Sequence, residues 1–175
     1  MWKHLFIGIL LICHFTTYSQ NVSENLLAGN WLVVRWETQD RLLDFQDTAA
    51  SVKFMVDNFK QKNKVQTIPK DDSVHIRQEV TRILTAAGAI RFRISLNKDK
   101  TFTWTGNGNN NAQYKGTYAL ANSNNELVLT SFDGATKAYR TMALKLHALQ
   151  PNQMIIEIPS EEPGFKQSKF TLRRQ

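Results

Sequence analysis

The stretch that decides the fold is IRFRISLNKDKTFTWT, residues 90–105. Apolar and polar residues alternate through residues 90–97, and a period of two places all the apolar side chains on one face of a strand. The polar segment 97–100 then provides a turn. In residues 101–105 the aromatic residues share one face and the threonines share the other. The stretch therefore predicts a half-buried antiparallel hairpin.

The rest of the C-terminal half repeats this arrangement of short strands between turns. Turn-forming residues recur in GNGNNN, ANSNN, DG, PNQ and SEEPG, at residues 106–111, 121–125, 133–134, 151–153 and 160–164. Sequential antiparallel strands in such a number can close into a barrel that has no exposed edge. The sequence predicts a mainly β fold, an eight-stranded antiparallel up-and-down barrel. Its further strands are expected at residues 30–37, 114–120, 126–132, 137–149, 154–158 and 166–174.

The segment of about residues 46–87 has a different period, which is typical of helices. It predicts two amphipathic helices inserted after the first strand, with Pro69 between them. Asp71, Asp72 or Ser73 is expected to cap the second helix, and Gly88 is expected just past its end. The apolar positions at helical spacing are Val52, Met55, Val56 and Phe59, followed by Ile76, Val80, Ile83, Leu84 and Ala87.

The N-terminus is typical of a secretory signal peptide. Lys3 and His4 precede an apolar run at residues 5–15, and small residues follow up to Ser19. Cleavage there leaves residues 20–175 as one exported domain, periplasmic or extracellular. Lipid anchoring through Cys13 is the alternative, which is less favoured because the preceding Ile12 is not small.

Composition limits the classes of partner. Cys13 is the only cysteine, so disulfides cannot stabilise the domain after signal removal. The chain has a formal net charge of +7 at pH 7, which attracts anionic surfaces at long range. Because the basic residues are spread along the chain, we expect no nucleic-acid partner. No transmembrane segment is expected, since the apolar run at residues 5–15 is too short to span a bilayer.

Two short motifs carry a resemblance to a known family. Gly29-Asn30-Trp31 begins the first strand, and Arg173 and Arg174 end the last one. This pattern resembles lipocalins and the wider calycin group, in particular bacterial lipocalin-like domains with a helical insertion. The resemblance implies that Trp31 crosses the barrel floor beside Gly29 and that a late arginine packs over it. Arg174 is favoured on strand phase, with Arg173 as the alternative.

The resemblance extends through the C-terminal half. The turn at residues 97–100, the Gly116-Thr117-Tyr118 strand and the segment 126–129, ELVL, are similar to those of short bacterial lipocalin-like domains. The helical insertion is longer than anything that ordinary lipocalins place there. No cysteine pair ties the C-terminal region to the barrel. These departures leave the ligand open.

Catalytic and metal chemistry is not indicated. After signal removal the histidines are His75 and His147, which lack the spacing of a zinc site. No GxSxG motif presents a serine nucleophile, and Glu161 and Glu162 fall in a Pro-Gly loop. We therefore expect a protein that is not an enzyme and that has no cofactor or metal.

The expected function is binding of a small apolar or amphipathic molecule inside the barrel, with the helices closing one end as a lid. The alternative is a protein-interaction or inhibitor module whose barrel is filled and whose loops and helices bind the partner. Oligomeric state is left open. The residues expected to line the ligand site are Trp36, Phe92, Phe102, Trp104, Tyr114 and Tyr118, and Phe132, Phe165 and Phe170 are also expected on apolar faces.

Overall fold

The computed structural model describes residues 24–89, 91–106, 113–121, 125–134, 136–159 and 167–175. The expected signal peptide, its alternative lipidation site at Cys13, the residues 107–111 and the Glu161-Glu162 loop lie outside these ranges. The described helices are α1 (Glu24–Leu27), α2 (Thr48–Asn63) and α3 (Lys70–Ala89). The described strands are β1 (Gly29–Glu37), β2 (Leu42–Asp44), β3 (Phe92–Leu96), β4 (Thr101–Gly106), β5 (Gln113–Ala121), β6 (Glu126–Asp133), β7 (Ala138–Gln150), β8 (Gln153–Ile158) and β9 (Ser168–Arg174).

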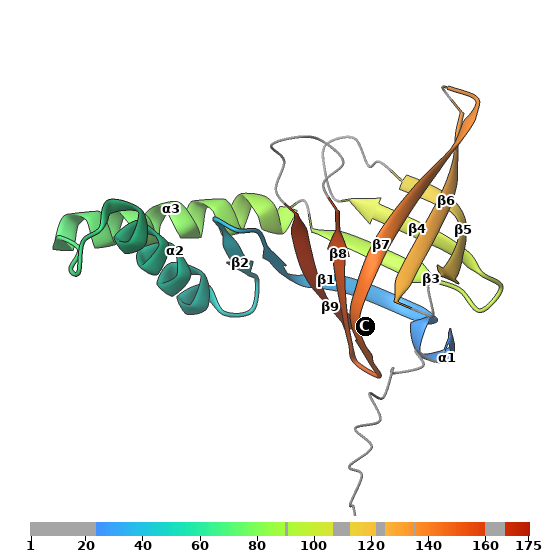
Figure 1. Ribbon diagram of the computed structural model, residues 1–175, viewed down its shortest axis with the longest axis horizontal. Helices are drawn as coiled ribbons and strands as arrows, with labels where there is room; N and C mark the ends of the chain where they lie inside the picture. Colours follow the sequence, from blue (N-terminus) through green and yellow to red (C-terminus); the bar gives the residue numbers. More distant parts are fainter. Residues whose placement is uncertain (1–23, 90, 107–112, 122–124, 135, 160–166) are drawn as a thin grey trace, which may run out of the picture.

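Eight of these strands close into an antiparallel barrel, which confirms the predicted fold class (Figure 1). Strands β3 to β9 follow one another around the wall, each hydrogen-bonded to the next. The ring closes where β1 pairs with β9, from Trp31 opposite Arg174 to Glu37 opposite Lys169. Closure leaves no free edge along the ring, which protects it from pairing with another chain.

Strand β1 changes neighbours halfway along one edge. Residues Gly29 to Leu32 pair with β3, whereas Arg35 to Glu37 pair with the short strand β2, which the sequence analysis did not predict. A β-bulge lies between Val33 and Arg35 on the opposite, β9-paired edge. At the change of neighbours, the Arg91 Nε donates to the Val33 carbonyl at 2.9 Å. The chain therefore leaves the barrel wall at the end of β1 without leaving this carbonyl unpaired.

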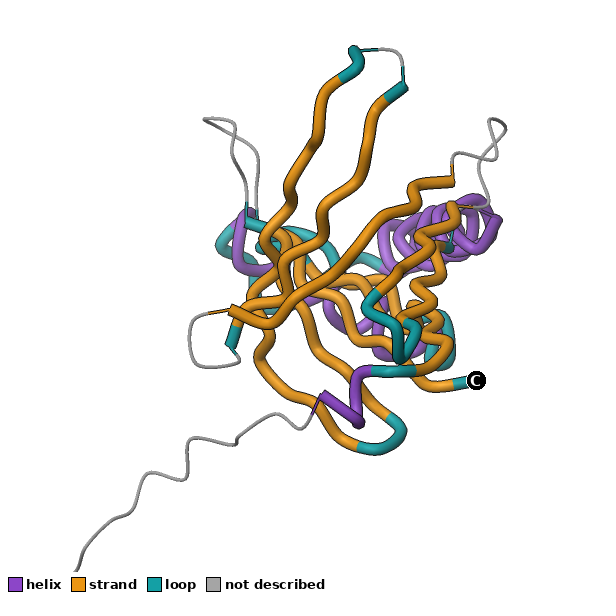
Figure 2. Tube along the Cα trace, turned by 90° about the vertical axis from the view of Figure 1, so that its right-hand side faces the viewer, coloured by secondary structure: helices purple, strands orange, loops and turns teal. Residues whose placement is uncertain are grey.

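The two inserted helices form an arm, defined as residues 48–89, that projects away from the barrel (Figures 1 and 2). Helix α2 begins after Asp47, whose side chain accepts from the Ala50 amide at 3.0 Å. It ends at Asn63, and Lys64 caps it with a left-handed backbone. The arm packs mainly between its own helices and onto β2. Its expected role as a lid over the barrel stays a prediction.

The expected boundaries of the second helix were also wrong. Helix α3 begins at Lys70, directly after Pro69, so Asp71, Asp72 and Ser73 lie inside its first turn and do not cap it. Acidic side chains in a first turn still favour the helix dipole. Gly88 lies inside the helix rather than past its end.

One end of the barrel, here called the floor, is closed by Leu27, Trp31 and Arg174. The Trp31 Nε1 donates to the Leu27 carbonyl at 2.8 Å. The Arg174 guanidinium lies 4.6 Å from the centre of the Trp31 ring and also donates to the carbonyls of Leu26 and Ala28. A cation over an indole adds on the order of 0.5–2 kcal/mol. Above the floor, fully buried side chains fill the barrel: Ile94, Leu96, Leu127, Leu144, Met154, Ile156 and Leu172.

Candidate functional site

The packing stops short of the opposite end of the barrel, here called the mouth, where a pocket of about 520 Å³ remains. This volume lies within the range of about 300–1,000 Å³ that is typical of small-molecule sites. Its walls come from strands on both sides of the barrel interior. The lining residues are Phe102, Trp104, Tyr114, Leu129, Ser131, Arg140, Thr141, Met142, Ala143, Ile158 and Pro159.

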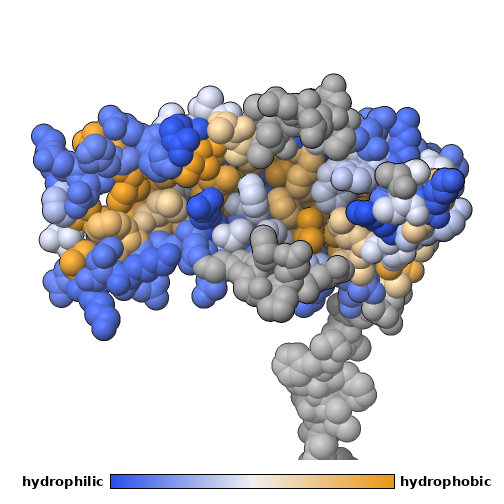
Figure 3. Space-filling view, turned by 90° about the horizontal axis from the view of Figure 1, so that it is seen from above, coloured by the Kyte–Doolittle hydropathy of each residue, from blue (hydrophilic) through white to orange (hydrophobic). Residues whose placement is uncertain are grey.

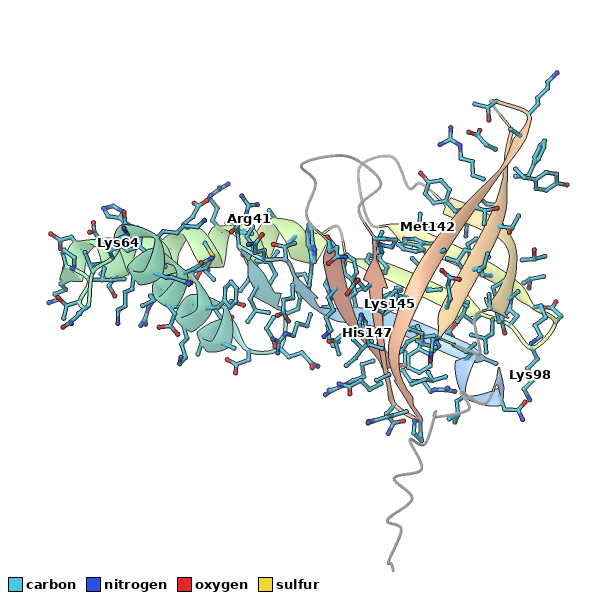
Figure 4. The ribbon with its side chains drawn as sticks, in the orientation of Figure 1. Arg41, Lys64, Lys98, Met142, Lys145 and His147 are labelled. Atoms are coloured by element: carbon cyan, nitrogen blue, oxygen red, sulfur yellow. The ribbon has the colours of Figure 1, made fainter. Side chains whose placement is uncertain are left out.

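Strand register explains why these side chains meet. Directly opposed residues of an antiparallel pair point to the same face. Trp104 is opposite Tyr114, and Leu129 is opposite Met142. Figure 4 shows Met142 nearer the hairpin end of β7 than Lys145 and His147, so it lies on the mouth side of the barrel. Inward-facing residues near the mouth ends of β4 to β7 therefore form the pocket wall.

An aromatic cluster continues from this wall around the mouth. Phe92 stacks on Trp104 with ring centroids 4.5 Å apart. Phe170 meets Phe92 edge-on at 4.9 Å and stacks on Trp36 at 5.8 Å. Such contacts add about 0.5–1.5 kcal/mol each beyond the burial of apolar area. The cluster makes one side of the mouth rigid and apolar.

The Trp36 indole in this cluster has an unmet hydrogen bond. Among the described residues, its Nε1 is buried and has no acceptor within hydrogen-bond distance. An unsatisfied buried donor costs about 1–3 kcal/mol. By contrast, Trp31 on the same strand has its Nε1 paired. Trp36 therefore offers a donor at the mouth for which the described residues provide no acceptor.

Charge at the mouth is concentrated at the rim. Arg140 forms an ion pair with Asp133 at 2.8 Å, and its side chain is largely exposed. Arg91 lies over the Phe45 ring at 5.0 Å. Partial burial, and to a lesser degree the charge of Arg93, lowers the pKa of Arg91 below its ordinary value. Arg91 is therefore a structural residue of the β1–β2 junction, and Arg140 is the cation that borders the pocket.

The expected lining residues divide into three groups. Phe102, Trp104 and Tyr114 line the pocket. Trp36 and Phe92 belong to the adjoining cluster. Tyr118 lies toward the floor, where its hydroxyl donates to the Asn97 carbonyl at 2.7 Å, and it does not line this pocket.

Several pocket residues were missed by sequence reasoning. Ser131, Arg140 and Met142 line the pocket, although none of them is a large aromatic residue. Strand phase could have identified them, because each lies an even number of positions from a buried leucine on its own strand and therefore faces the barrel interior. Phe132 was expected on an apolar face, but it points outward and is 56% exposed.

The floor residues named from the lipocalin resemblance lie together. An added Cβ at Gly29 would come within 3.0 Å of the Arg174 Nη1, so the glycine leaves room for the guanidinium. Arg174 covers Trp31, whereas Arg173 is exposed. The choice of Arg174 on strand phase agrees with this arrangement.

A second pocket, of about 590 Å³, lies on the outer side of β1, β8 and β9. Polar and charged side chains dominate its lining, among them Arg35, Glu37 and Lys169. Arg35 and Glu37 pair with each other at 3.1 Å. This surface differs from the mouth pocket in having few apolar side chains.

Metal-binding groups do not gather in the described part of the chain, where no three His, Cys, Asp or Glu residues lie together. His75 is exposed on α3. His147 contacts Glu157 at 2.8 Å on the outer face of the barrel. Among the described helices, none is long and apolar enough to cross a membrane.

Comparison with known proteins adds no argument about the fold or the function. No protein-family model matches the sequence, and no curated protein matches it. A similar solved structure is that of an uncharacterized protein from Bacteroides eggerthii DSM 20697, with 12% identity and a TM-score of 0.38. The match covers 85% of this chain and 98% of that chain. The assignment as a closed barrel with a helical insertion rests on the strand pairing described above.

Proposed function

We propose that this chain is an exported, lipocalin-like binding protein that holds a small apolar or amphipathic molecule in the mouth pocket and catalyses no reaction. The observation that carries the proposal is the half-filled barrel. Its floor is packed, yet about 520 Å³ remains open beneath an aromatic wall. The Trp-Arg floor closure is the feature shared with the lipocalin pattern.

The pocket suits a molecule with an apolar body and a polar end. Phe102, Leu129 and Ile158 would contact the body, while Ser131 and Arg140 lie where a polar end would face the rim. Apolar walls with a few polar groups are the usual composition of such sites. An acceptor on the ligand that reached Trp36 would also pair its buried Nε1.

The test compares ligand binding by two matched tryptophan substitutions on β6. Ser131→Trp points into the pocket, whereas Thr130→Trp points out of the barrel, because successive strand residues face opposite sides. We expect S131W to weaken binding of a dansyl-labelled fatty acid by roughly tenfold or more, since the indole fills the pocket. T130W should bind as the parent does. Equal binding by both variants would place the probe elsewhere and contradict the proposal.

A second candidate function is partner binding through the arm. Val65 and Val74 are 40% and 46% exposed, and Figure 3 shows apolar side chains along the arm between its charged edges. Exposed apolar surface of this kind marks interaction sites. Native mass spectrometry of protein from its own cell envelope separates the two functions. A small mass added to that of the chain would favour ligand binding in the pocket. A bound second polypeptide that is absent from a V65S/V74S variant would favour partner binding through the arm.

Export is also a proposal, and it depends on residues 1–19. The N-terminal sequence of the mature protein tests it. A start at Gln20 would support cleavage of the signal peptide, and a lipidated Cys13 would support the anchored alternative.

A further inference from the structure

The β6–β7 hairpin extends beyond the barrel wall at the mouth (Figures 1 and 2). Its two outward-facing rings, Phe132 and Tyr139, are 56% and 76% exposed. They are directly opposed across the hairpin and meet edge-on, with centroids 5.3 Å apart. An isolated two-stranded ribbon is only marginally stable in water. This cross-strand pair stabilises the ribbon and at the same time presents aromatic surface to its surroundings.

The inward face of the hairpin carries Ser131 and Arg140 beside these rings, and apolar side chains follow nearer the barrel wall. Tyr114 and Met142 lie at the pocket edge and are 56% and 42% exposed. Of the six large hydrophobic residues that are exposed among those described, four therefore surround this corner of the mouth. The other two, Val65 and Val74, lie at the far end of the arm. Apolar exposure is thus concentrated beside the pocket opening.

The charge around these rings is mainly positive. Lys115, Lys137 and Arg140 are exposed in residues 113–115 and 131–142, where Asp133 is the acidic residue among those described. Asp133 is paired with Arg140 at 2.8 Å. Tyrosine rings favour the boundary between lipid headgroups and acyl chains, and basic side chains favour an anionic leaflet. The hairpin therefore carries both aromatic rings, which favour the headgroup boundary, and basic side chains, which favour anionic lipid.

We propose that the β6–β7 hairpin docks the mouth of the barrel onto an anionic lipid surface. The two rings on the outward face suit the boundary of a lipid layer, and Met142 and Tyr114 add apolar surface where the ribbon leaves the barrel wall. The positive charge complements anionic headgroups. Docked in this way, the pocket opens toward the membrane. The proposal extends the binding function given above, since a ligand would then enter from the lipid.

The experiment is flotation of the mature chain with vesicles of one part phosphatidylglycerol to three parts phosphatidylcholine. The double variant F132S/Y139S removes both rings, and K137E reverses one charge. Each should lower the vesicle partition coefficient, the double variant by roughly tenfold or more. The matched control is V65S/V74S, which removes two exposed apolar side chains from the arm. It should bind vesicles as the parent does.

Two results would overturn the proposal: binding of the parent chain to pure phosphatidylcholine as strongly as to anionic vesicles, or unchanged binding by F132S/Y139S. Circular dichroism checks that each variant is folded, which we expect because both rings are exposed. The dansyl fatty acid assay without vesicles tests the pocket separately, since Phe132 and Tyr139 do not line it. Loss of vesicle binding with retained probe binding is the expected result for F132S/Y139S. A parent chain that binds vesicles but no probe would contradict the proposed function and leave the docking surface standing.

Discussion

The floor and the mouth of this barrel are built from the same strands and the same residue types, yet they differ in completeness. At the floor, Trp31 is fully buried, its Nε1 is paired and a guanidinium covers its ring. At the mouth, Trp36 stacks on Phe170, and its Nε1 has no acceptor among the described residues. The open pocket lies at the other end of the same aromatic cluster. The Arg174 Nε at the floor is also buried without a partner among the described residues, so the two ends differ in packing and not in how fully their polar groups are paired. The contrast teaches that the unfilled end, not the barrel as a whole, is the place to look for a ligand.

The largest expected effect compares the two tryptophans. Trp31→Ala should lower the free energy of unfolding by about 3–5 kcal/mol, because it opens a cavity in the packed floor. Trp36→Ala should cost less than about 2 kcal/mol, because its side chain is only partly buried against the core. Urea unfolding of both variants measures the difference. Equal losses would mean that the mouth is packed as tightly as the floor.

The next comparison uses neighbouring arginines on β9. Arg174→Met removes the cation above Trp31 and the donors to Leu26 and Ala28, and we expect a loss of about 3 kcal/mol. Arg173→Met is the control, since Arg173 is exposed, and it should change stability by less than about 0.5 kcal/mol. Thermal unfolding monitored by circular dichroism gives both values. An equal loss of stability in R173M and R174M would show that the Arg174 guanidinium does not contribute specifically to floor closure.

A smaller effect separates two tyrosines on β5. Tyr118→Phe deletes the hydroxyl that donates to Asn97, which should cost about 1 kcal/mol. Tyr114→Phe, at the mouth, should leave the stability unchanged because that ring is 56% exposed. Chemical denaturation of the pair is sensitive enough to resolve this difference. A destabilised Y114F would indicate a hydrogen bond at the mouth that the described residues do not account for.

The smallest expected effect is a change in stability that is close to zero or slightly stabilising. Trp36→Phe removes the unpaired Nε1 while keeping a ring in the cluster. We expect stability within about 0.5 kcal/mol of the parent, or slightly above it, because a buried unsatisfied donor is lost. Calorimetric melting without added ligand measures this change. A clear destabilisation would show that the indole nitrogen already has a partner in the unliganded protein.

Most of the fold could be predicted because its determinants are local. The alternation in residues 90–105 fixes which face of each strand is buried, and turn residues mark where the strands end. The barrel follows from the number and order of strands. Strand β2 was missed because Leu42–Asp44 is too short to show a period, and it is stabilised by pairing with β1. Helix α3 began earlier than expected, at Lys70 directly after Pro69.

The candidate site was only partly predictable, because it depends on depth along the barrel. Strand phase states which residues face inward, but not whether an inward residue lies near the floor or near the mouth. Tyr118 and Tyr114 share one phase, yet only Tyr114 reaches the pocket. Phe132 has the opposite phase to Ser131, and it is exposed because the hairpin extends past the neighbouring strands. How deep a residue lies in the barrel depends on how its strand is aligned with its neighbours. That alignment is set by pairing between strands and does not show in the pattern of a single strand.

Closure of the ring through β1 and β9 has a consequence for the order of folding. Arg174 reaches back across 146 positions to the carbonyl of Ala28, so the first strand cannot acquire its final neighbour until the last residues are available. Contacts between such distant positions slow folding, whereas the arm can form early from contacts within residues 48–89. A chain that emerges from its N-terminus would therefore remain an open sheet until β9 is available to pair with β1. Removal of the last seven residues should leave it in that state.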